Sequence, residues 1–357
     1  MITFEKRVRP EFTPYTITDI PEEKIMYFDI ETTGLSPKTS FVYLIGALYL
    51  SDDGYVLKQW FADTLDCEKE ILSNFMEFSH NFEMIIHYNG AGFDIPFIIK
   101  KCEIHNIPCD FSGIKSFDIY KKISPLKKLF SIDNLKQKSI EAFLNIKRMD
   151  MYSGGELINA YYEYLQKKDD KLRELLLLHN HDDVLGMQKI MPIVNYECLV
   201  SGGFAPVSKE IEADKFSIEL TLDSFLPKRI SGGNNNFHFT ACKNTAIIDV
   251  RIYNGELKYF YPNYKDYYYL PDEDKSIHKS VAFYVDKNFR TKAKAANCYG
   301  RKTGMFLPQY EEIITPYFKI DYYDKITYFE LSDENINDDV KIKEYCRMLF
   351  NKICSGN

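Results

Sequence analysis

An apolar run that ends in two closely spaced acids constrains the fold of this chain more than any other feature. Residues Ile25 to Leu35 read I-M-Y-F-D-I-E-T-T-G-L, a pattern that indicates a buried strand followed by a turn. Because residues i and i+2 of a strand point to the same side, Asp29 and Glu31 should project together from its end. Two converging carboxylates suit a hard divalent cation, and a strand that simply ends in solvated acids is the alternative.

Length and composition indicate an ordinary globular protein. The chain has 357 residues, enough for two domains, with 45% hydrophobic and 27% charged residues. Its eight cysteines form no C-x-x-C pair, which argues against a zinc site or a disulfide framework. The N-terminus lacks an apolar signal core, and no apolar run approaches the roughly 20 residues that span a bilayer. We therefore expect a cytoplasmic protein that does not contact membranes.

Periodicity predicts an α/β first domain over residues 1–200. Expected strands are the run from Ile25, Phe41–Leu50, Leu57–Ala62, Met84–Tyr88 and Ser116–Tyr120. Expected helices are Glu68–Phe82, a helix through Phe97–Ile99, Ile132–Ile146, Gly155–Gln166 and Asp169–Ile190. Short turns join the first three strands as antiparallel neighbours, and helices alternate with strands afterwards. This order predicts a mixed five-stranded sheet flanked by helices.

The sequence becomes β-rich and aromatic after a glycine-containing segment at Val200–Pro206, which predicts a second, α+β domain over residues 201–357. Asn254-Gly255 between two apolar runs predicts a hairpin turn. Further expected elements are strands at Tyr267–Leu270, Val281–Val285 and Ile326–Leu331, and a closing helix at Asp339–Ile353. No function for this domain follows from its sequence.

Two other segments could complete a site begun by Asp29 and Glu31. In H-Y-N-G-A-G-F-D-I-P-F a glycine-punctuated loop leads to Asp94 at the start of a helix, where the acid could bind a metal or merely cap the helix. Asn89 and Phe93 in this loop are further candidates, Asn89 for a hydrogen bond at the strand end. Phe93 would pack against a terminal base of a substrate or against the core.

The last segment is L-L-L-L-H-N-H-D-D-V-L-G-M, where polar residues interrupt an apolar helix. At about 100° per residue, His179 and Asp183 lie only some 40° apart and share a face. His181 lies roughly 200° from His179, so the two cannot face one site. Asp182 is the ambiguous neighbour, because one of the two adjacent acids should face solvent or a salt bridge.

Taken together, F-D-I-E-T-T-G-L, N-G-A-G-F-D-I-P-F and H-N-H-D-D-V resemble, in the same order, the three motifs of the DEDD superfamily of ribonuclease H-like 3'-5' exonucleases. The resemblance covers about residues 24–196. It implies a ribonuclease H-like fold, four metal-binding carboxylates (Asp29, Glu31, Asp94 and Asp183), two Mg²⁺ or Mn²⁺ ions, and single-stranded DNA or RNA as substrate.

The resemblance leaves the water-activating residue less certain than the acids. Family members place a Tyr four residues, or a His five residues, before the last Asp, whereas here His179 stands four residues before Asp183. His179 is nevertheless the candidate base, because an imidazole titrates near neutral pH. Two alternatives stay open: a nucleic-acid-binding or regulatory protein that keeps the fold without cleaving, and an endonuclease of the same fold.

Charge points to a further candidate surface, although the net charge of −7 does not attract a polyanion. Residues 287–302 carry six bases and no acid, beside Phe289, Tyr299 and Phe306. Basic residues with aromatic neighbours can hold a single strand, which makes Lys292, Lys294 and Arg301 candidate substrate contacts. A second basic stretch runs from Lys121 to Arg148. The alternatives are a solvated helix face and a C-terminal portion that simply covers a sheet face.

Overall fold

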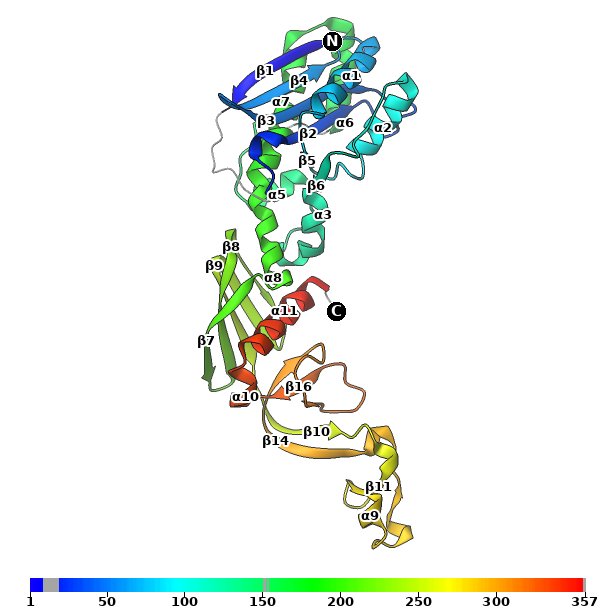
Figure 1. The fold of residues 1–357 in the computed structure, drawn as a ribbon, viewed down its shortest axis with the longest axis vertical. Coiled ribbons are helices and arrows are strands. Elements are labelled where there is room, and N and C mark those ends of the chain that lie inside the picture. Colours follow the sequence, from blue (N-terminus) through cyan, green and yellow to red (C-terminus); the bar gives the residue numbers. More distant parts are fainter. Residues whose placement is uncertain (9–18, 150–151, 153, 356–357) are drawn as a thin grey trace. The chain divides into compact units, whose positions relative to one another are not determined.

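The computed structural model describes residues 1–8, 19–149, 152 and 154–355. Its contacts divide the chain into two compact units, Met1–Val194 and Asn195–Asn357, which Figure 1 shows as a ribbon. The sequence placed this division at residue 200. The structure places it before helix α8 (Glu197–Ser201), because α8 packs against α11 (Asp339–Ser355) and β8 (Lys215–Gly233) of the second unit.

The first unit is built on a six-stranded mixed sheet of order β1-β4-β3-β2-β5-β6 in the part of the chain described. Its strands are β1 (Ile2–Val8), β2 (Ile25–Thr32), β3 (Val42–Ser51), β4 (Gly54–Phe61), β5 (Met84–His87) and β6 (Lys115–Asp118). β1 to β4 pair antiparallel, whereas β2, β5 and β6 run parallel. The predicted mixed sheet is confirmed, with six strands in place of five. The sequence missed β1 because this edge strand is largely polar and exposed.

Helices cover both faces of this sheet. They are α1 (Glu68–Ser79), α2 (Asp94–His105), α3 (Ile119–Ile123), α4 (Lys127–Phe130), α5 (Gln137–Phe143), α6 (Gly154–Lys167) and α7 (Asp170–Ile190). The predicted helix over 132–146 is shortened to α5. Ser131 and Asn145 on either side adopt left-handed backbone conformations (φ 52° and 60°), which a right-handed helix cannot contain.

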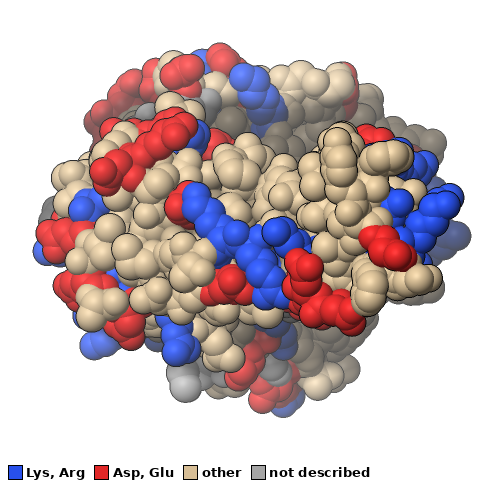
Figure 2. Space-filling view, turned by 90° about the horizontal axis from the view of Figure 1, so that it is seen from below, with Lys and Arg blue, Asp and Glu red and all other residues tan. Residues whose placement is uncertain are grey.

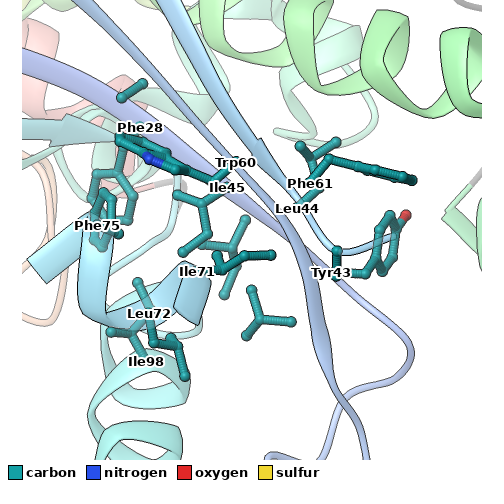
Figure 3. Close-up of a cluster of buried hydrophobic side chains, with 14 of the residues drawn as sticks. Phe28, Tyr43, Leu44, Ile45, Trp60, Phe61, Ile71, Leu72, Phe75 and Ile98 are labelled. Carbon is teal, nitrogen blue, oxygen red and sulfur yellow. The ribbon is translucent and has the colours of Figure 1, made fainter. Parts of the chain in front are cut away.

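The hydrophobic core lies between the sheet and α1 (Figure 3). Phe28 of β2 packs on Phe75 of α1 with ring centroids 5.3 Å apart, and Trp60 contacts the same ring from β4. Side chains on the other face meet α6, where Tyr43 stacks on Tyr161 at 4.2 Å. Since strand side chains alternate, Asp29 next to Phe28 must face away from α1, toward the helices of the second layer.

The second unit contains three antiparallel sheets in its described residues, of order β7-β8-β9, β10-β14-β16-β15 and β12-β11-β13. Its other strands are β7 (Phe204–Glu212), β9 (Phe237–Arg251), β10 (Tyr253–Phe260), β11 (Tyr267–Leu270), β12 (Lys275–His278), β13 (Thr291–Lys292), β14 (Tyr299–Gln309), β15 (Tyr317–Phe318) and β16 (Thr327–Glu330). Helices α9 (Lys279–Ala282) and α10 (Asp333–Ile336) complete it. Phe350 of α11 packs on Phe239 of β9, so α11 covers the first of these sheets.

Two predictions in the second unit are wrong. Asn254 and Gly255 form no hairpin turn but lie inside β10, opposite Met305 and Gly304 of β14. The preceding apolar run belongs to β9 and pairs with β8, so the two runs join different sheets. The expected strand over 281–285 is instead the end of helix α9 and a turn, because His278 accepts a hydrogen bond from Ser280 N and starts a helix there.

Candidate metal centre

Strand β2 presents the first two acids. Asp29 and Glu31 are half-buried on the face opposite Phe28, as the alternation predicted. Asp29 lies across from Gly46 of β3, where the absence of a side chain lets helix α7 approach. A Cβ at Gly46 would lie 2.0 Å from Asn180 Oδ1 and 3.0 Å from Val184 Cγ2. Gly46 is therefore what allows α7 to lie directly over the acids.

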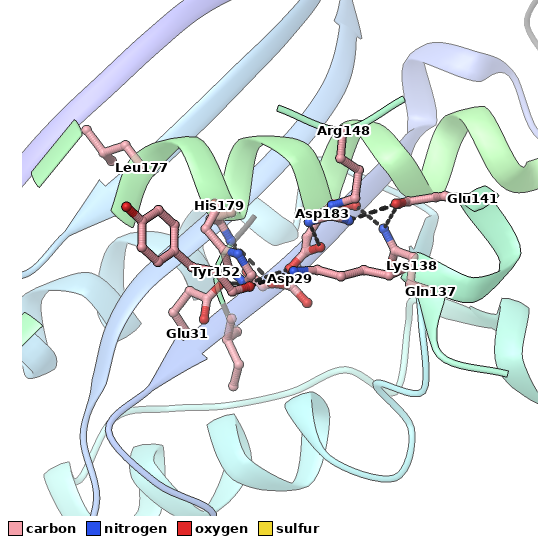
Figure 4. Close-up of polar contacts among 12 residues, drawn as sticks. Asp29, Glu31, Gln137, Lys138, Glu141, Arg148, Tyr152, Leu177, His179 and Asp183 are labelled. Carbon is pink, nitrogen blue, oxygen red and sulfur yellow. Dashed lines mark hydrogen bonds and ion pairs between the residues drawn. The ribbon is translucent and has the colours of Figure 1, made fainter. Parts of the chain in front are cut away.

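Helix α7 brings His179 and Asp183 to the same place (Figure 4). His179 Nε2 lies 3.1 Å from Asp183 Oδ2 and 3.5 Å from Glu31 Oε1. One ligand atom from each of Glu31, His179 and Asp183 lies within 4.8 Å of the others, close enough for all three to hold one cation. The shared face of His179 and Asp183, expected from helical geometry, is what the structure contains.

Asn180 and Gln59 hold α7 against the sheet, and neither residue was predicted from the sequence. Asn180 is fully buried, and its Nδ2 donates to Asp29 Oδ2 at 3.3 Å and to the Asp29 carbonyl at 3.4 Å. Gln59 Nε2 donates in turn to Asn180 Oδ1 and to the Leu177 carbonyl, both at 2.9 Å. A buried amide that meets a complementary amide has its hydrogen bonds satisfied, so this pair sets the orientation of the Asp29 carboxyl.

Asp94 approaches from the start of α2. It is buried, and its Oδ1 accepts a hydrogen bond from Ile30 N at 3.2 Å, between the two acids of β2. Asp94 is the first residue of α2 and follows the N-cap residue Phe93, whose side chain makes no capping hydrogen bond. Burial raises the pKa of Asp94 to about 7, against the opposing effect of the Ile30 hydrogen bond.

The loop before Asp94 is held by groups outside the predicted set. Asp118, buried at the end of β6, accepts from Asn89 N at 3.0 Å and Ala91 N at 3.3 Å. Asn89 has a left-handed backbone (φ 63°), and Phe93 packs on Phe97 with centroids 5.4 Å apart. Phe93 thus contacts the core. Substrate contacts of Asn89 and Phe93 remain predictions.

Arg148 is a further neighbour that the sequence showed only as part of a basic stretch. Its Nη2 lies 2.6 Å from Asp183 Oδ1, and its Nη1 lies 3.0 Å from both oxygens of Glu141, which is buried. Gln137 joins the cluster by donating to Glu141 Oε1 at 2.9 Å and to the Asp183 carbonyl at 2.8 Å. Figure 4 shows the network of hydrogen bonds and ion pairs through which these side chains connect α5 to α7.

Asp182, the acid next to Asp183 on α7, faces away from the candidate metal ligands. Asp182 is buried and accepts from Met149 N at 2.8 Å, while His181 Nδ1 lies 3.1 Å from its other oxygen. It therefore supports the chain around residue 149, and Asp183 is the acid at the site. A cavity of about 480 Å³ lies on this side of Arg148, lined in part by Lys147 and Asp182.

The electrostatics of the site favour a bound cation. Burial raises the pKa of Asp29 well above its usual value, and the charges of Asp94, Glu31 and Asp183 raise it further. Burial acts on Asp183 in the same direction, but His179 and Arg148 outweigh it and lower that pKa. Carboxylates that repel one another at such close range gain from a divalent ion, and carboxylate oxygens are ligands that suit Mg²⁺ or Mn²⁺.

The three candidate substrate contacts in the second unit differ in whether their side chains are exposed or ion-paired. Lys292 on β13 and Lys294 after it are exposed. Arg301 on β14 is engaged, since its Nη1 lies 2.6 Å from Glu256 Oε1 and its Nη2 pairs with Asp274. Figure 2 shows one face of the molecule on which basic side chains have acidic ones directly beside them. Substrate contacts of Lys292, Lys294 and Arg301 remain predictions.

Comparison with protein families shows which superfamily the first unit resembles. A model of the RNase_H superfamily matches residues 26–195. Residues 26–195 form an RNase H-like domain. No curated protein matches the chain. The RNase H-like domain holds all of the candidate ligands, and its limits agree with those of the sequence resemblance, about residues 24–196.

Two solved structures are similar to parts of the chain. The family B DNA polymerase from the hyperthermophilic archaeon Pyrobaculum calidifontis has a TM-score of 0.41 and 16% identity over 67% of this chain and 34% of its own. The ExoI/SSB-Ct complex has a TM-score of 0.29 and 12% identity over 61% of this chain and 55% of its own. The chain thus spans less than two thirds of either structure, and likenesses this weak carry no argument about activity. Among the described helices, none combines the length and apolar character needed to cross a membrane.

Proposed function

We propose that the RNase H-like domain is a divalent-metal-dependent nuclease that removes nucleotides from the 3' end of single-stranded DNA or RNA. The observation that supports it most is the clustering of Glu31, His179 and Asp183 ligand atoms within 4.8 Å, beside Asp29 and Asp94. The polarity of digestion rests on the resemblance of the three motifs.

In this proposal Asp29, Glu31, Asp94 and Asp183 hold two Mg²⁺ or Mn²⁺ ions. Such ions, when bound, lower the pKa of water and neutralise the charge that develops at phosphorus. The chain itself keeps the ligands in place: Ile30 N holds Asp94, and the Asn180 amide holds Asp29. Because these partners belong to a strand and a packed helix, the carboxyl groups need little reorganisation.

His179 would take the proton of the attacking water. Its Nε2 lies 3.5 Å from Glu31 Oε1 and 3.1 Å from Asp183 Oδ2, so the buried imidazole stands beside two of the proposed metal ligands. His179 therefore occupies the place in this chain where the resembled family has a Tyr four residues before its last Asp.

A rival function has one observation in its favour. Arg148 Nη2 lies 2.6 Å from one oxygen of Asp183 while His179 lies 3.1 Å from the other, so both oxygens already have cationic or hydrogen-bonding neighbours. A protein in which Arg148 permanently replaced a metal would bind nucleic acid without cleaving it. Cleavage assays separate the two functions directly.

The test uses the full chain with 5'-labelled single-stranded DNA and RNA in Mg²⁺ or Mn²⁺, with EDTA as the metal-free control. We expect a ladder that shortens from the 3' end and that Asp29→Asn abolishes. Asp170→Asn, whose side chain is 73% exposed on the same helix α7, should cleave like the wild type. His179→Ala should lose most of the activity, whereas His179→Tyr, which restores the family residue at this spacing, should retain part of it.

Other outcomes would contradict the proposal in distinct ways. Internal cuts that depend on Asp29 would replace the exonuclease with an endonuclease of the same site. Binding of either nucleic acid without any metal-dependent cleavage would support the binding protein. Cleavage that survives Asp29→Asn would show that the activity comes from elsewhere.

A further inference from the structure

The second unit exposes a group of large apolar side chains at and after helix α9. The exposed fractions are 55% for Val281, 80% for Phe283, 86% for Tyr284 and 59% for Phe289. α9 has only four residues and turns Ala282 inward, where it is fully buried. Single exposed apolar residues are common, but four within nine positions mark a surface that contacts something else.

Basic residues alternate with these apolar ones along the chain. Residues 279–294, which we call the aromatic tip, contain five bases and a single acid, Asp286, in a chain whose net charge is −7. Asp286 is engaged as the cap of a short helical turn, where its Oδ1 accepts from Asn288 N at 2.8 Å. Within the described part of the chain, Lys287, Lys292 and Lys294 form no ion pair and are exposed.

The other two bases of the aromatic tip serve its structure. Arg290 lies over the ring of Tyr268 at 4.9 Å and donates to the Ala282 carbonyl, so it holds the turn after α9 against β11. Lys279 pairs with Asp266 at 3.1 Å. The charge available to a partner is therefore that of the three unpaired lysines.

Both rings remain accessible. Phe283 and Tyr284 lie 5.7 Å apart at an interplanar angle of 89°, so the edge of one ring meets one face of the other, and the two residues are 80% and 86% exposed. Flat apolar faces beside spaced ammonium groups complement a polyanion with exposed planar bases. A protein partner would need a continuous apolar patch, whereas here lysines interrupt the aromatic residues along the chain.

We propose that the aromatic tip binds single-stranded nucleic acid, with Phe283 and Tyr284 stacking on bases and Lys287, Lys292 and Lys294 contacting phosphates. The proposal extends the nuclease function above and rests on it for the identity of the ligand. The proposal also changes which residues of the basic stretch 287–302 are expected to contact the substrate. Tyr299 and Phe306 are buried and Arg301 is ion-paired, so the contacts shift toward the N-terminal side of that stretch.

The experiment separates stacking from charge. Binding of labelled oligothymidylate and oligouridylate to the full chain is measured in EDTA, where no metal-dependent cleavage occurs, over a range of salt concentrations. Phe283→Ala with Tyr284→Ala should weaken binding about tenfold for each ring and leave the salt dependence unchanged. Lys287→Gln with Lys292→Gln and Lys294→Gln should weaken binding and lower the slope of log affinity against log salt by about 2.

Two controls test whether the effects are local. Tyr323→Ala removes a ring that is 82% exposed outside the aromatic tip, and Lys325→Gln removes an exposed charge beside it. Both should bind like the wild type. Unfolding temperatures of all variants should match the wild type, since the altered side chains are exposed, and a variant that melts early is replaced by Phe283→Ser or Tyr284→Ser.

The proposal is overturned if the aromatic variant binds as tightly as the wild type, or if both sets of variants change the salt slope alike. It is also overturned if the wild type binds phosphatidylserine vesicles through Phe283 and Tyr284 while oligonucleotide binding is unaffected, because the tip would then recognise a membrane. If the wild type binds through the aromatic tip but does not cleave, the proposal for the aromatic tip is supported and the proposed nuclease function is contradicted. If it cleaves but its binding does not depend on the aromatic tip, the nuclease function is supported and the proposal for the aromatic tip is contradicted.

Discussion

His87 shapes the candidate metal centre although it touches none of the predicted ligands. The ring is 1% exposed, its Nδ1 accepts from Gly90 N at 3.0 Å, and its Nε2 lies 2.7 Å from Ser116 Oγ. Since Nδ1 must be an acceptor, the neutral ring with a proton on Nε2 satisfies both contacts. Gly90 begins the turn that leads to Asp94, and a Cβ there would lie 2.7 Å from the His87 ring. Burial of this neutral imidazole thus fixes the loop.

The stability of the protein should therefore fall in mild acid. Burial lowers the pKa of His87 to about 4, against an ordinary value near 6.5, so the unfolded chain binds this proton more readily than the folded one. The contribution of His87 is complete above pH 6.5 and is lost as the pH falls toward 4, by at most about 3 kcal/mol.

Urea unfolding at pH 7 and at pH 4.5 measures this effect. His87→Gln should lower the free energy of unfolding at pH 7 and should show a smaller decrease between the two pH values than the wild type. His238→Gln, at an exposed position, provides the matched control and should keep the wild-type dependence. An equal decrease in the wild type and His87→Gln would assign the acid sensitivity to other groups.

Individual residues were predictable where one local pattern contained them. Asp29 and Glu31 follow from strand alternation, and His179 and Asp183 follow from helical spacing. Asn180, Gln59, His87 and Arg148 were not predictable, because each contacts a partner at least 29 residues away along the chain. Their importance arises from burial, which a polar residue type does not reveal by itself.

At the scale of elements, the contact between α7 and the sheet decides whether the acids meet. α7 lies over β2 and β3. Asn180 of α7 donates a hydrogen bond to Asp29 and packs against Gly46. Any side chain at Gly46 pushes α7 away from the strand that carries Asp29 and Glu31. The close approach of these elements therefore matters as much as the acids themselves.

Gly46→Ala should destabilise the protein by about 2 kcal/mol, the usual cost of an additional carbon in a packed interface. The added Cβ would lie 2.0 Å from Asn180 Oδ1, so Asn180 or α7 must move. Gly113→Ala is the control, because a Cβ there meets nothing within 4 Å. Chemical denaturation measures both, and equal stability of the two variants would show that α7 accommodates the side chain without cost.

Elements were predicted well where periodicity is strong and poorly where the partner strand is remote. The long helices α6 and α7 and the strands β2 to β5 agree with the expected positions. The Asn254-Gly255 signal failed because a turn needs the flanking runs to pair with each other, and here each pairs with a different strand. The polar β1 was missed because its strand character depends on pairing with β4, more than 40 residues along the chain.

At the scale of the whole molecule, two units with separate cores divide the chain. All candidate metal ligands belong to the first unit. Units that form their own cores can unfold separately, so a ligand that binds only one of them should stabilise that unit alone.

Calorimetry should show this selectivity. Mn²⁺ at about a hundredfold above its dissociation constant should stabilise the first unit by about 2.7 kcal/mol and raise its unfolding temperature. The transition of the second unit should not move, and Asp29→Asn should remove the shift. EDTA reverses the effect in the wild type. A shift of both transitions, or one that persists in Asp29→Asn, would place the metal elsewhere.

The sequence by itself determined the mixed sheet, the order of the acidic motifs and the face of each acid, because strand and helix periods are local properties of the backbone. Tertiary structure alone decided the rest. It brought Glu31, His179 and Asp183 within 4.8 Å, set Arg148 against Asp183, and exposed Phe283 and Tyr284 where the sequence predicted a strand. These features depend on which distant segments pack together, and packing is chosen by the free energy of the whole fold.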